Sequence, residues 1–456
     1  MSKSTHLGLG IVCAILSYLI GQSVLGLSYQ QAITVSVTVL TGYYWITEAI
    51  PIPLASIIPI GLLPFTGVLT HQQSAASLGN HVILLLMGAF MLAVAIESSG
   101  VHRRIAFNII QLIGGNSAKR IVFSIMATAA LLSMWISNTA TVVALLPVVL
   151  AIIKCSDDPR FKIALLLGLA YAASIGGVGT LIGTPPNVIF ASVYEQFAGQ
   201  EFGFLRWMKI AVPIIIFAIP VMALWLARGI KLNKTIELTP SGAWEIAEKR
   251  VLLIFALVAL AWVFRKEPFG GWSGLFALNS VGDSSIALMG VVLMAICPDG
   301  KGGRLLSWEK AKDIPWGMLL LFAGGICIAK AFVESGLSAL LGELFVALGH
   351  LPVLLALFLL AVGVSFLTEI TSNTATATLL MPVIASAAIA LNLPLELLMI
   401  PVVISCSCAF CLPVATAPNS IVFASGEVTI QDMVRNGIVL NIVVAMIVAI
   451  VCYALI

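Results

Sequence analysis

Charged residues are scarce in this sequence. Only 9% of its 456 residues are Asp, Glu, Lys or Arg, whereas 60% are hydrophobic, and the mean hydropathy is +1.11. Globular chains carry about 25% charged residues, so this composition excludes a soluble protein. No polar stretch is long enough to form a sizeable domain outside a bilayer. The composition therefore predicts an all-α polytopic membrane protein.

Clusters of chemically reactive side chains are also missing. Cys406, Cys408 and Cys411 share one apolar run without a nearby histidine, so we expect buried thiols there rather than a metal site. The apolar runs hold no His, Asp or Cys grouping typical of an enzyme, and no polar pore or charged ring typical of a channel. Both classes stay open as alternatives, but we expect no catalytic residue and no cofactor. The net charge of +3 gives no reason to expect a nucleic-acid partner.

Apolar runs of membrane-spanning length recur along the whole chain. A spanning helix needs about 20 such residues, and we predict eleven spans, at 11–27, 31–48, 51–69, 81–98, 163–198, 209–228, 250–265, 283–298, 315–334, 395–425 and 437–455. The first lacks a small-residue cleavage site, so it is interpreted as a retained helix and not as a signal peptide. With the N-terminus in the cytoplasm, most Lys and Arg residues fall on the inner side. We therefore expect a multi-pass protein of the inner (plasma) membrane.

The tripeptide Ser-Asn-Thr occurs twice, in segments that do not fit as ordinary spans. The first copy lies between Arg120 and Lys154, which enclose only 33 residues, although two crossings would need roughly 40 plus a turn. Residues 120–154 are therefore predicted to form a re-entrant helical hairpin with 137–139 at its tip. The second copy lies in 352–391, where the hairpin prediction depends on the repeat and not on length.

Both copies belong to a longer internal repeat, with an offset close to 235 residues. A broken helix follows each hairpin, at 163–198 with the motif Thr-Pro-Pro-Asn and at 395–425 with Thr-Ala-Pro-Asn. Five predicted crossings separate equivalent segments, so the halves would have opposite orientations, as in many secondary transporters. The predicted parts are an N-terminal helix (1–30), a first repeat (31–228), a cytoplasmic linker (229–249) and a second repeat (250–456).

Hairpin tips and helix breaks expose backbone groups that have lost their helical partners. Free carbonyls carry partial negative charge and free N–H groups partial positive charge, so a break can coordinate a small cation on one side and an anion on the other. No Lys or Arg lies in either tip or break, so a co-bound cation would have to offset the desolvation of a buried anion. Glu97 and Glu334 end helices beside glycine and are expected at the membrane interface. The same pattern predicts that Glu369 lies deeper in the membrane, where carboxylates are often functional. Its repeat counterpart is Met134, so Glu369 cannot be a ligand that both halves supply.

At these tips, breaks and inverted halves, the sequence resembles the divalent anion/sodium symporter family of dicarboxylate, citrate and sulfate carriers, over nearly the whole chain. Residues 135–141, Trp-Ile-Ser-Asn-Thr-Ala-Thr, are similar to its sodium-coupled dicarboxylate members. The resemblance implies a homodimer in which a transport domain moves against a static scaffold, as in an elevator. The second break has Ala417 where the first has Pro185, and this departure from the pattern leaves the detailed geometry of the second break open.

The resemblance also implies a set of site residues. The substrate carboxylates would contact Ser137, Asn138, Thr139, Thr184, Ser372, Asn373, Thr374 and Thr416. One sodium ion would bind at Ser133, Ser137, Asn138 and the carbonyl of Gly183, and another at Thr368, Asn373 and the carbonyl of Ala415.

The prediction is a secondary active symporter that imports a C4 dicarboxylate such as succinate, malate or fumarate with sodium as the coupling ion. Its partners would be the dicarboxylate, sodium, the lipid bilayer and a second copy of the chain. Within transporters, sulfate or citrate as the substrate and sodium-independent exchange stay open as alternatives.

Overall fold

The computed structural model describes residues 3–113, 117–154, 158–230, 243–267, 269–340 and 351–456. Within these ranges the chain is helical, and its one β-bridge joins Pro298 to Arg304. Seven helices in the described ranges are long and apolar enough to cross a membrane, and several shorter helices are apolar too. The predicted all-α, multi-pass class is confirmed.

The helices follow one another without a β-sheet between them in the described ranges. They are α1 (Lys3–Ser23), α2 (Tyr29–Thr47), α3 (Ile52–Ala55), α4 (Ile57–Phe65), α5 (His71–Leu78), α6 (His81–Ser99), α7 (Val101–Ile113), α8 (Ala118–Ser133), α9 (Asn138–Ile153), α10 (Pro159–Gly177), α11 (Pro185–Ala198), α12 (Phe204–Leu226), α13 (Ile246–Val263), α14 (Gly271–Leu275), α15 (Asp283–Ile296), α16 (Trp308–Ala311), α17 (Trp316–Glu334), α19 (Val353–Thr368), α20 (Asn373–Ala390), α21 (Leu395–Cys406), η2 (Pro413–Ala415), α22 (Ala417–Ala424) and α23 (Ile430–Leu455).

The predicted spans coincide with helices but not always with single ones. The span at 51–69 is divided between α3 and α4, with Ser56 as the junction. The helix α7 was not predicted, because it is amphipathic: its buried residues are Val101, His102, Ala106 and Ile110, and it packs along α8. The predicted linker 229–249 lies largely outside the described residues.

Two helical hairpins occur where the sequence predicts them. The pair α8 and α9 turns at residues 134–137, and the pair α19 and α20 turns at 369–372. The helices α8, α9 and α19 each have 16 residues, which at 1.5 Å per residue is about 24 Å, less than the roughly 30 Å of a hydrocarbon core. This length favours the prediction that the hairpins enter the membrane without crossing it.

A break follows each hairpin. The helix α10 ends at Gly177 and α11 begins at Pro185, while α21 ends at Cys406 and α22 begins at Ala417 after the short η2. Proline is favoured in the first turn of a helix, where its missing N–H has no intrahelical acceptor. The order hairpin, helix, break, helix is therefore the same in both halves; their inverted orientation stays a prediction.

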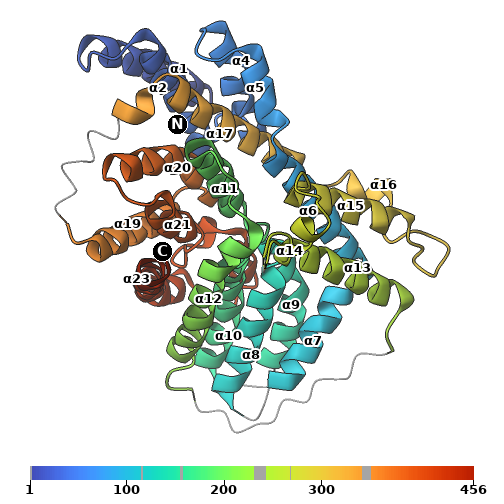
Figure 1. The fold of residues 1–456 in the computed structure, drawn as a ribbon. Coiled ribbons are helices and arrows are strands. Elements are labelled where there is room, and N and C mark those ends of the chain that lie inside the picture. Colours follow the sequence, from blue (N-terminus) through green and yellow to red (C-terminus); the bar gives the residue numbers. More distant parts are fainter. Residues whose placement is uncertain (1–2, 114–116, 155–157, 231–242, 268, 341–350) are drawn as a thin grey trace.

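Apart from α7, which packs mainly on α8, the helices form two groups that meet along one boundary. We call α8–α12 with α19–α23 the inner bundle, and α1–α6 with α13–α17 the outer arm. Figure 1 shows the outer arm running from α1 and α2 past α17 to α6, α13 and α15, along the side of the bundle. The bundle touches the arm chiefly through α11, which packs on α17 and α6, and through α20, which packs on α17 and α2.

Candidate functional site

A cavity of about 610 Å³ lies where the two helix groups meet. Both hairpin tips and both helix breaks of the inner bundle line one part of it, and α6 with the start of α17 lines the other. It contains all eight residues that the sequence predicts to contact substrate: Ser137, Asn138, Thr139, Thr184, Ser372, Asn373, Thr374 and Thr416. The backbone of Gly183 and Ala415 borders it as well.

The two hairpin tips are built alike. Ser133 is fully buried, and its Oγ lies 2.6 Å from Asn138 Oδ1 and 2.6 Å from the carbonyl oxygen of Ala173. In the second tip, Thr368 Oγ1 lies 2.7 Å from Asn373 Oδ1 and 3.0 Å from the carbonyl oxygen of Cys406. Each hydroxyl has one proton for two acceptors. Each tip therefore holds a group of three oxygens with spare lone pairs, which is the kind of ligand set that a small hard cation prefers.

Further carbonyl oxygens gather at the first break. A Cβ atom added at Gly183 would lie 2.9 Å from the carbonyl oxygens of Ser133 and Met134, and closer still to that of Gly177. A Cβ atom added at Gly177 would in turn meet Asn138 Oδ1 and, at 3.1 Å, the carbonyl oxygen of Gly183. Glycine is required at both positions because oxygen atoms of the hairpin and of the break converge there: backbone oxygens at Gly183, and Asn138 Oδ1 with the Gly183 carbonyl oxygen at Gly177.

Two asparagines behind the breaks were not predicted as site residues. Asn187 Nδ2 donates to the carbonyl oxygens of Gly177, Val178 and Thr180 at 2.7–3.3 Å. Asn419 Nδ2 donates to those of Ala409 and Leu412, both at 3.0 Å. Both side chains are fully buried. They shape the breaks, and their recurrence as the last residue of the Thr-Pro-Pro-Asn and Thr-Ala-Pro-Asn motifs was the signal that could have found them.

Four helices begin at the cavity wall. The first residues of α9, α11, α20 and α22 follow Ser137, Thr184, Ser372 and Thr416, which all line the cavity. Ser137 and Thr416 cap their own helices, whereas the side chains of Thr184 and Ser372 accept no capping hydrogen bond. Each helix start carries about half a positive charge, so four of them present roughly +2. The wall is thus electropositive without a cationic side chain.

The charged side chains on the described wall are carboxylates. Glu97 at the end of α6 and Asp313 before α17 line the side formed by the outer arm, and both are exposed. No Lys, Arg or His occurs among the described lining residues. An anion would therefore be held by backbone N–H groups, amides and hydroxyls on the inner-bundle side of the cavity, opposite the side that carries the two carboxylates. Trp135 also lines the cavity, and its ring stacks on Phe204 and meets Phe255 edge-on.

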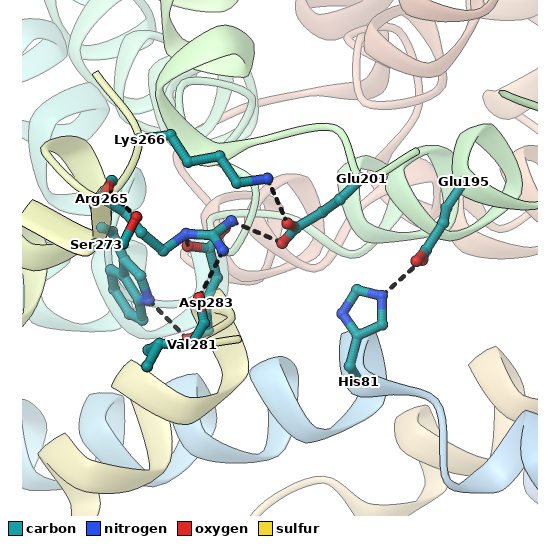
Figure 2. Close-up of polar contacts among 9 residues, drawn as sticks. His81, Glu195, Glu201, Arg265, Lys266, Ser273, Val281 and Asp283 are labelled. Carbon is teal, nitrogen blue, oxygen red and sulfur yellow. Dashed lines mark hydrogen bonds and ion pairs between the residues drawn. The ribbon is translucent and has the colours of Figure 1, made fainter. Parts of the chain in front are cut away.

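A second polar cluster links the helix groups outside this cavity. Figure 2 shows the Arg265 guanidinium between the carboxylates of Glu201, at 2.8 Å, and Asp283, at 2.7 Å. Lys266 reaches Glu201 from the other side at 2.9 Å. Burial alone would raise the pKa of Glu201, but the hydrogen bonds from Arg265 and Lys266 lower it below its usual value. Glu201 belongs to the inner bundle and its partners to the outer arm, so the cluster ties the two groups together.

The family model and the relatives that match this chain are all described as transporters. A family model described as "Citrate transporter" matches residues 43–397. The chain is 38% identical over 453 residues to a sodium-dependent dicarboxylate transporter, SdcS, of Staphylococcus aureus strain NCTC 8325, covering 94% of this chain and 86% of the relative. The SdcS of strain bovine RF122 is 37% identical over the same coverage.

A solved structure shares the fold. The YdaH transporter of Alcanivorax borkumensis, described as having an unusual topology, matches with a TM-score of 0.57 at 15% sequence identity, over 82% of this chain and 86% of that one. At this identity the likeness concerns the arrangement of helices alone.

Proposed function

The chain belongs to the divalent anion/sodium symporter family, and on that premise we propose that it is a sodium-coupled symporter that imports C4 dicarboxylates such as succinate, malate and fumarate. The family consists of transporters and not of enzymes, as predicted. The observation that carries the proposal is the convergence of both Ser-Asn-Thr tips and both helix breaks on one cavity that has no cationic side chain among its described lining residues.

The substrate would bind between the two tips. Asn138 and Thr139 offer an amide and a hydroxyl from one tip, and Asn373 and Thr374 offer the same from the other. Four helix starts of about half a charge each roughly balance a dianion. Two similar tips that face one cavity suit a molecule with a carboxylate at each end better than one with a single charged group.

Sodium would bind on the other side of each tip. The helices α8, α10, α19 and α21 end there, and the carbonyl groups of a last helical turn, which have no intrahelical N–H partner, carry partial negative charge. One site would be formed by oxygens of Ser133, Ser137, Asn138 and Gly183, and the other by oxygens of Thr368, Asn373 and Ala415. Bound sodium would fix the position of each asparagine, so substrate affinity would depend on sodium.

The transport step would be an elevator-like displacement of the inner bundle along the outer arm. The cavity lies at the boundary of the two groups, so such a movement carries the tips and breaks while α6 and α17 stay in place. The ion pairs of Arg265, Lys266 and Glu201 would have to break and re-form during each cycle. A homodimer held through the outer arm, in the inner membrane with the N-terminus in the cytoplasm, would give the arm its static role.

One alternative substrate is favoured by a specific observation. The matching family model is described as a citrate transporter, so citrate is the second candidate, as the substrate of a symporter or of a sodium-independent exchanger. Sulfate with sodium is the third. The cavity, at about 610 Å³, has room for any of these anions.

Transport by the purified protein in proteoliposomes tests these proposals. An inward sodium gradient should drive uptake of labelled succinate, and unlabelled malate and fumarate should compete more strongly than citrate or sulfate. Uptake that requires a preloaded counter-anion and does not depend on the sodium gradient would show exchange instead. Stronger competition by citrate would reassign the substrate while leaving symport intact.

A further inference from the structure

Glu369 is a buried carboxylate that does not line the cavity. It lies at the C-terminal end of α19, in the turn of the second hairpin, and is 4% exposed. Its Oε1 accepts hydrogen bonds from the backbone N–H groups of Phe410 at 2.7 Å and Cys411 at 2.8 Å, and its Oε2 from that of Leu412 at 3.0 Å. Asn441 Nδ2, from α23, donates to Oε1 at 2.8 Å. Four donors thus converge on one side chain.

These donors belong to the second helix break and to the helix behind it. Residues 410–412 connect α21 to η2, and the carbonyl oxygens of Ala409 and Leu412 in the same segment accept from Asn419. Asn441 is itself fully buried, and its Oδ1 accepts from Phe410 N at 3.2 Å. Glu369 therefore fixes the second break to the tip of the second hairpin.

The first half makes the corresponding link without a charge. The repeat places Met134 where the second half has Glu369. There the backbone carbonyl of Met134 accepts from the hydroxyl of Thr180 in the first break. In both halves the hairpin tip accepts and the break donates, but only the second half does so with a carboxylate.

The charge of Glu369 has no cationic side chain to neutralise it among the described ion pairs. Hydrogen bonds from four N–H donors make its burial tolerable, and all four are of the kind that an ionised carboxylate accepts. The residue before Glu369 in the chain is Thr368, whose hydroxyl belongs to the oxygen group of Asn373 and Cys406. Thus a fixed negative charge lies beside the oxygen group of the second tip, and the first tip has no counterpart.

We propose that Glu369 is a positioning residue for the second sodium site, which it builds by tying the break to the hairpin and favours by its negative charge. This inference rests on the sodium coupling proposed above. It makes the two sodium sites unequal: the second depends on Glu369, while the first depends on backbone and neutral groups alone.

The test is the sodium dependence of the Glu369→Gln variant. Glutamine keeps an oxygen for Phe410, Cys411 and Asn441, removes the charge, and turns an amide N–H₂ group toward the N–H of Leu412. We expect the sodium concentration for half-maximal succinate uptake to rise about tenfold, the effect typical of losing one buried charge-assisted contact. The KM for succinate at saturating sodium should change far less.

Glu396→Gln is the matched control. Glu396 undergoes the same chemical change on α21 of the inner bundle, but it pairs with Arg206 and does not line the cavity. Its sodium curve should match that of the wild type. Sodium-dependent stabilisation against heat, measured on the purified protein, gives a second reading that does not require transport.

The outcomes separate this inference from the proposed function. Sodium-dependent wild-type uptake with an unshifted sodium curve in Glu369→Gln overturns the inference alone, and so does a lower maximal rate without a shift. Sodium-independent wild-type uptake overturns the proposed function together with it. If Glu369→Gln does not fold, Asn441→Ser decides, because it removes one donor and keeps the carboxylate: a shift in the same direction supports the inference, and an unchanged sodium curve refutes it.

Discussion

Gly183→Ala should disable the first sodium site while leaving most of the fold intact. The added Cβ would lie 2.9 Å from the carbonyl oxygens of Ser133 and Met134, and closer to that of Gly177. All three atoms are backbone, so they cannot rotate away as a flexible side chain could. Overpacking of this kind costs typically 1–3 kcal/mol, which at a binding site corresponds to roughly 5–150-fold in affinity.

The measurement compares sodium activation of succinate uptake in Gly183→Ala and Gly363→Ala. Gly363 lies on α19 of the second hairpin, and an added Cβ there would meet no atom within 4 Å. The control should therefore fold and transport like the wild type, since alanine favours a helix over glycine by about 0.5–1 kcal/mol. A Gly183→Ala protein with the sodium curve of the wild type would refute the idea that the backbone oxygens converging on Gly183 bind sodium.

Three further outcomes are expected. Asn138→Ala and Asn373→Ala should each lower succinate uptake to background with unchanged expression and melting behaviour, whereas Asn108→Ala, an exposed residue of α7, should transport normally; wild-type uptake in both cavity variants would contradict the site. Arg265→Gln should lower the free energy of unfolding by about 1–3 kcal/mol, because it leaves the buried carboxylate of Asp283 without its partner, and an unchanged melting temperature would contradict the link between the helix groups. Hydrogen bonds from Arg265 and Lys266 lower the pKa of Glu201 below the ordinary glutamate value of 4.5. The ionised Glu201 should therefore stabilise the fold above pH 4.5 and lose this contribution as the pH falls through its lowered pKa. The difference in melting temperature between the wild type and Glu201→Gln should accordingly shrink on acidification.

The helices and hairpin tips could be predicted because their signals are local. Long apolar runs mark the spanning helices, and the short interval between Arg120 and Lys154 excludes two full crossings. The repeated Ser-Asn-Thr and Pro-Asn motifs mark the tips and breaks, and the structure brings the Ser-Asn-Thr residues and the prolines of both breaks to one cavity. An internal repeat gives this information because each half supports the interpretation of the other.

Other features depend on packing between distant segments and left no such signal. Neither the placement of Glu97 and Asp313 on the cavity wall nor the packing of α7 on α8 follows from a run or a motif, since each depends on which helix faces meet. The contacts of Glu369 join it to Cys411 and Asn441, 42 and 72 residues along the chain. The sequence predicts that the carboxylate of Glu369 lies unusually deep in the membrane, but it does not show which donors surround it.

Equilibrium binding of labelled succinate to the purified protein, in sodium and in equimolar potassium, tests the central claim most directly. We propose that one dicarboxylate lies between the two Ser-Asn-Thr tips and that sodium fixes Asn138 and Asn373 in place. We therefore expect saturable binding in sodium, none in potassium, and loss of binding when either asparagine alone is replaced by alanine. Equal binding in both salts, or full binding in either variant, would contradict it.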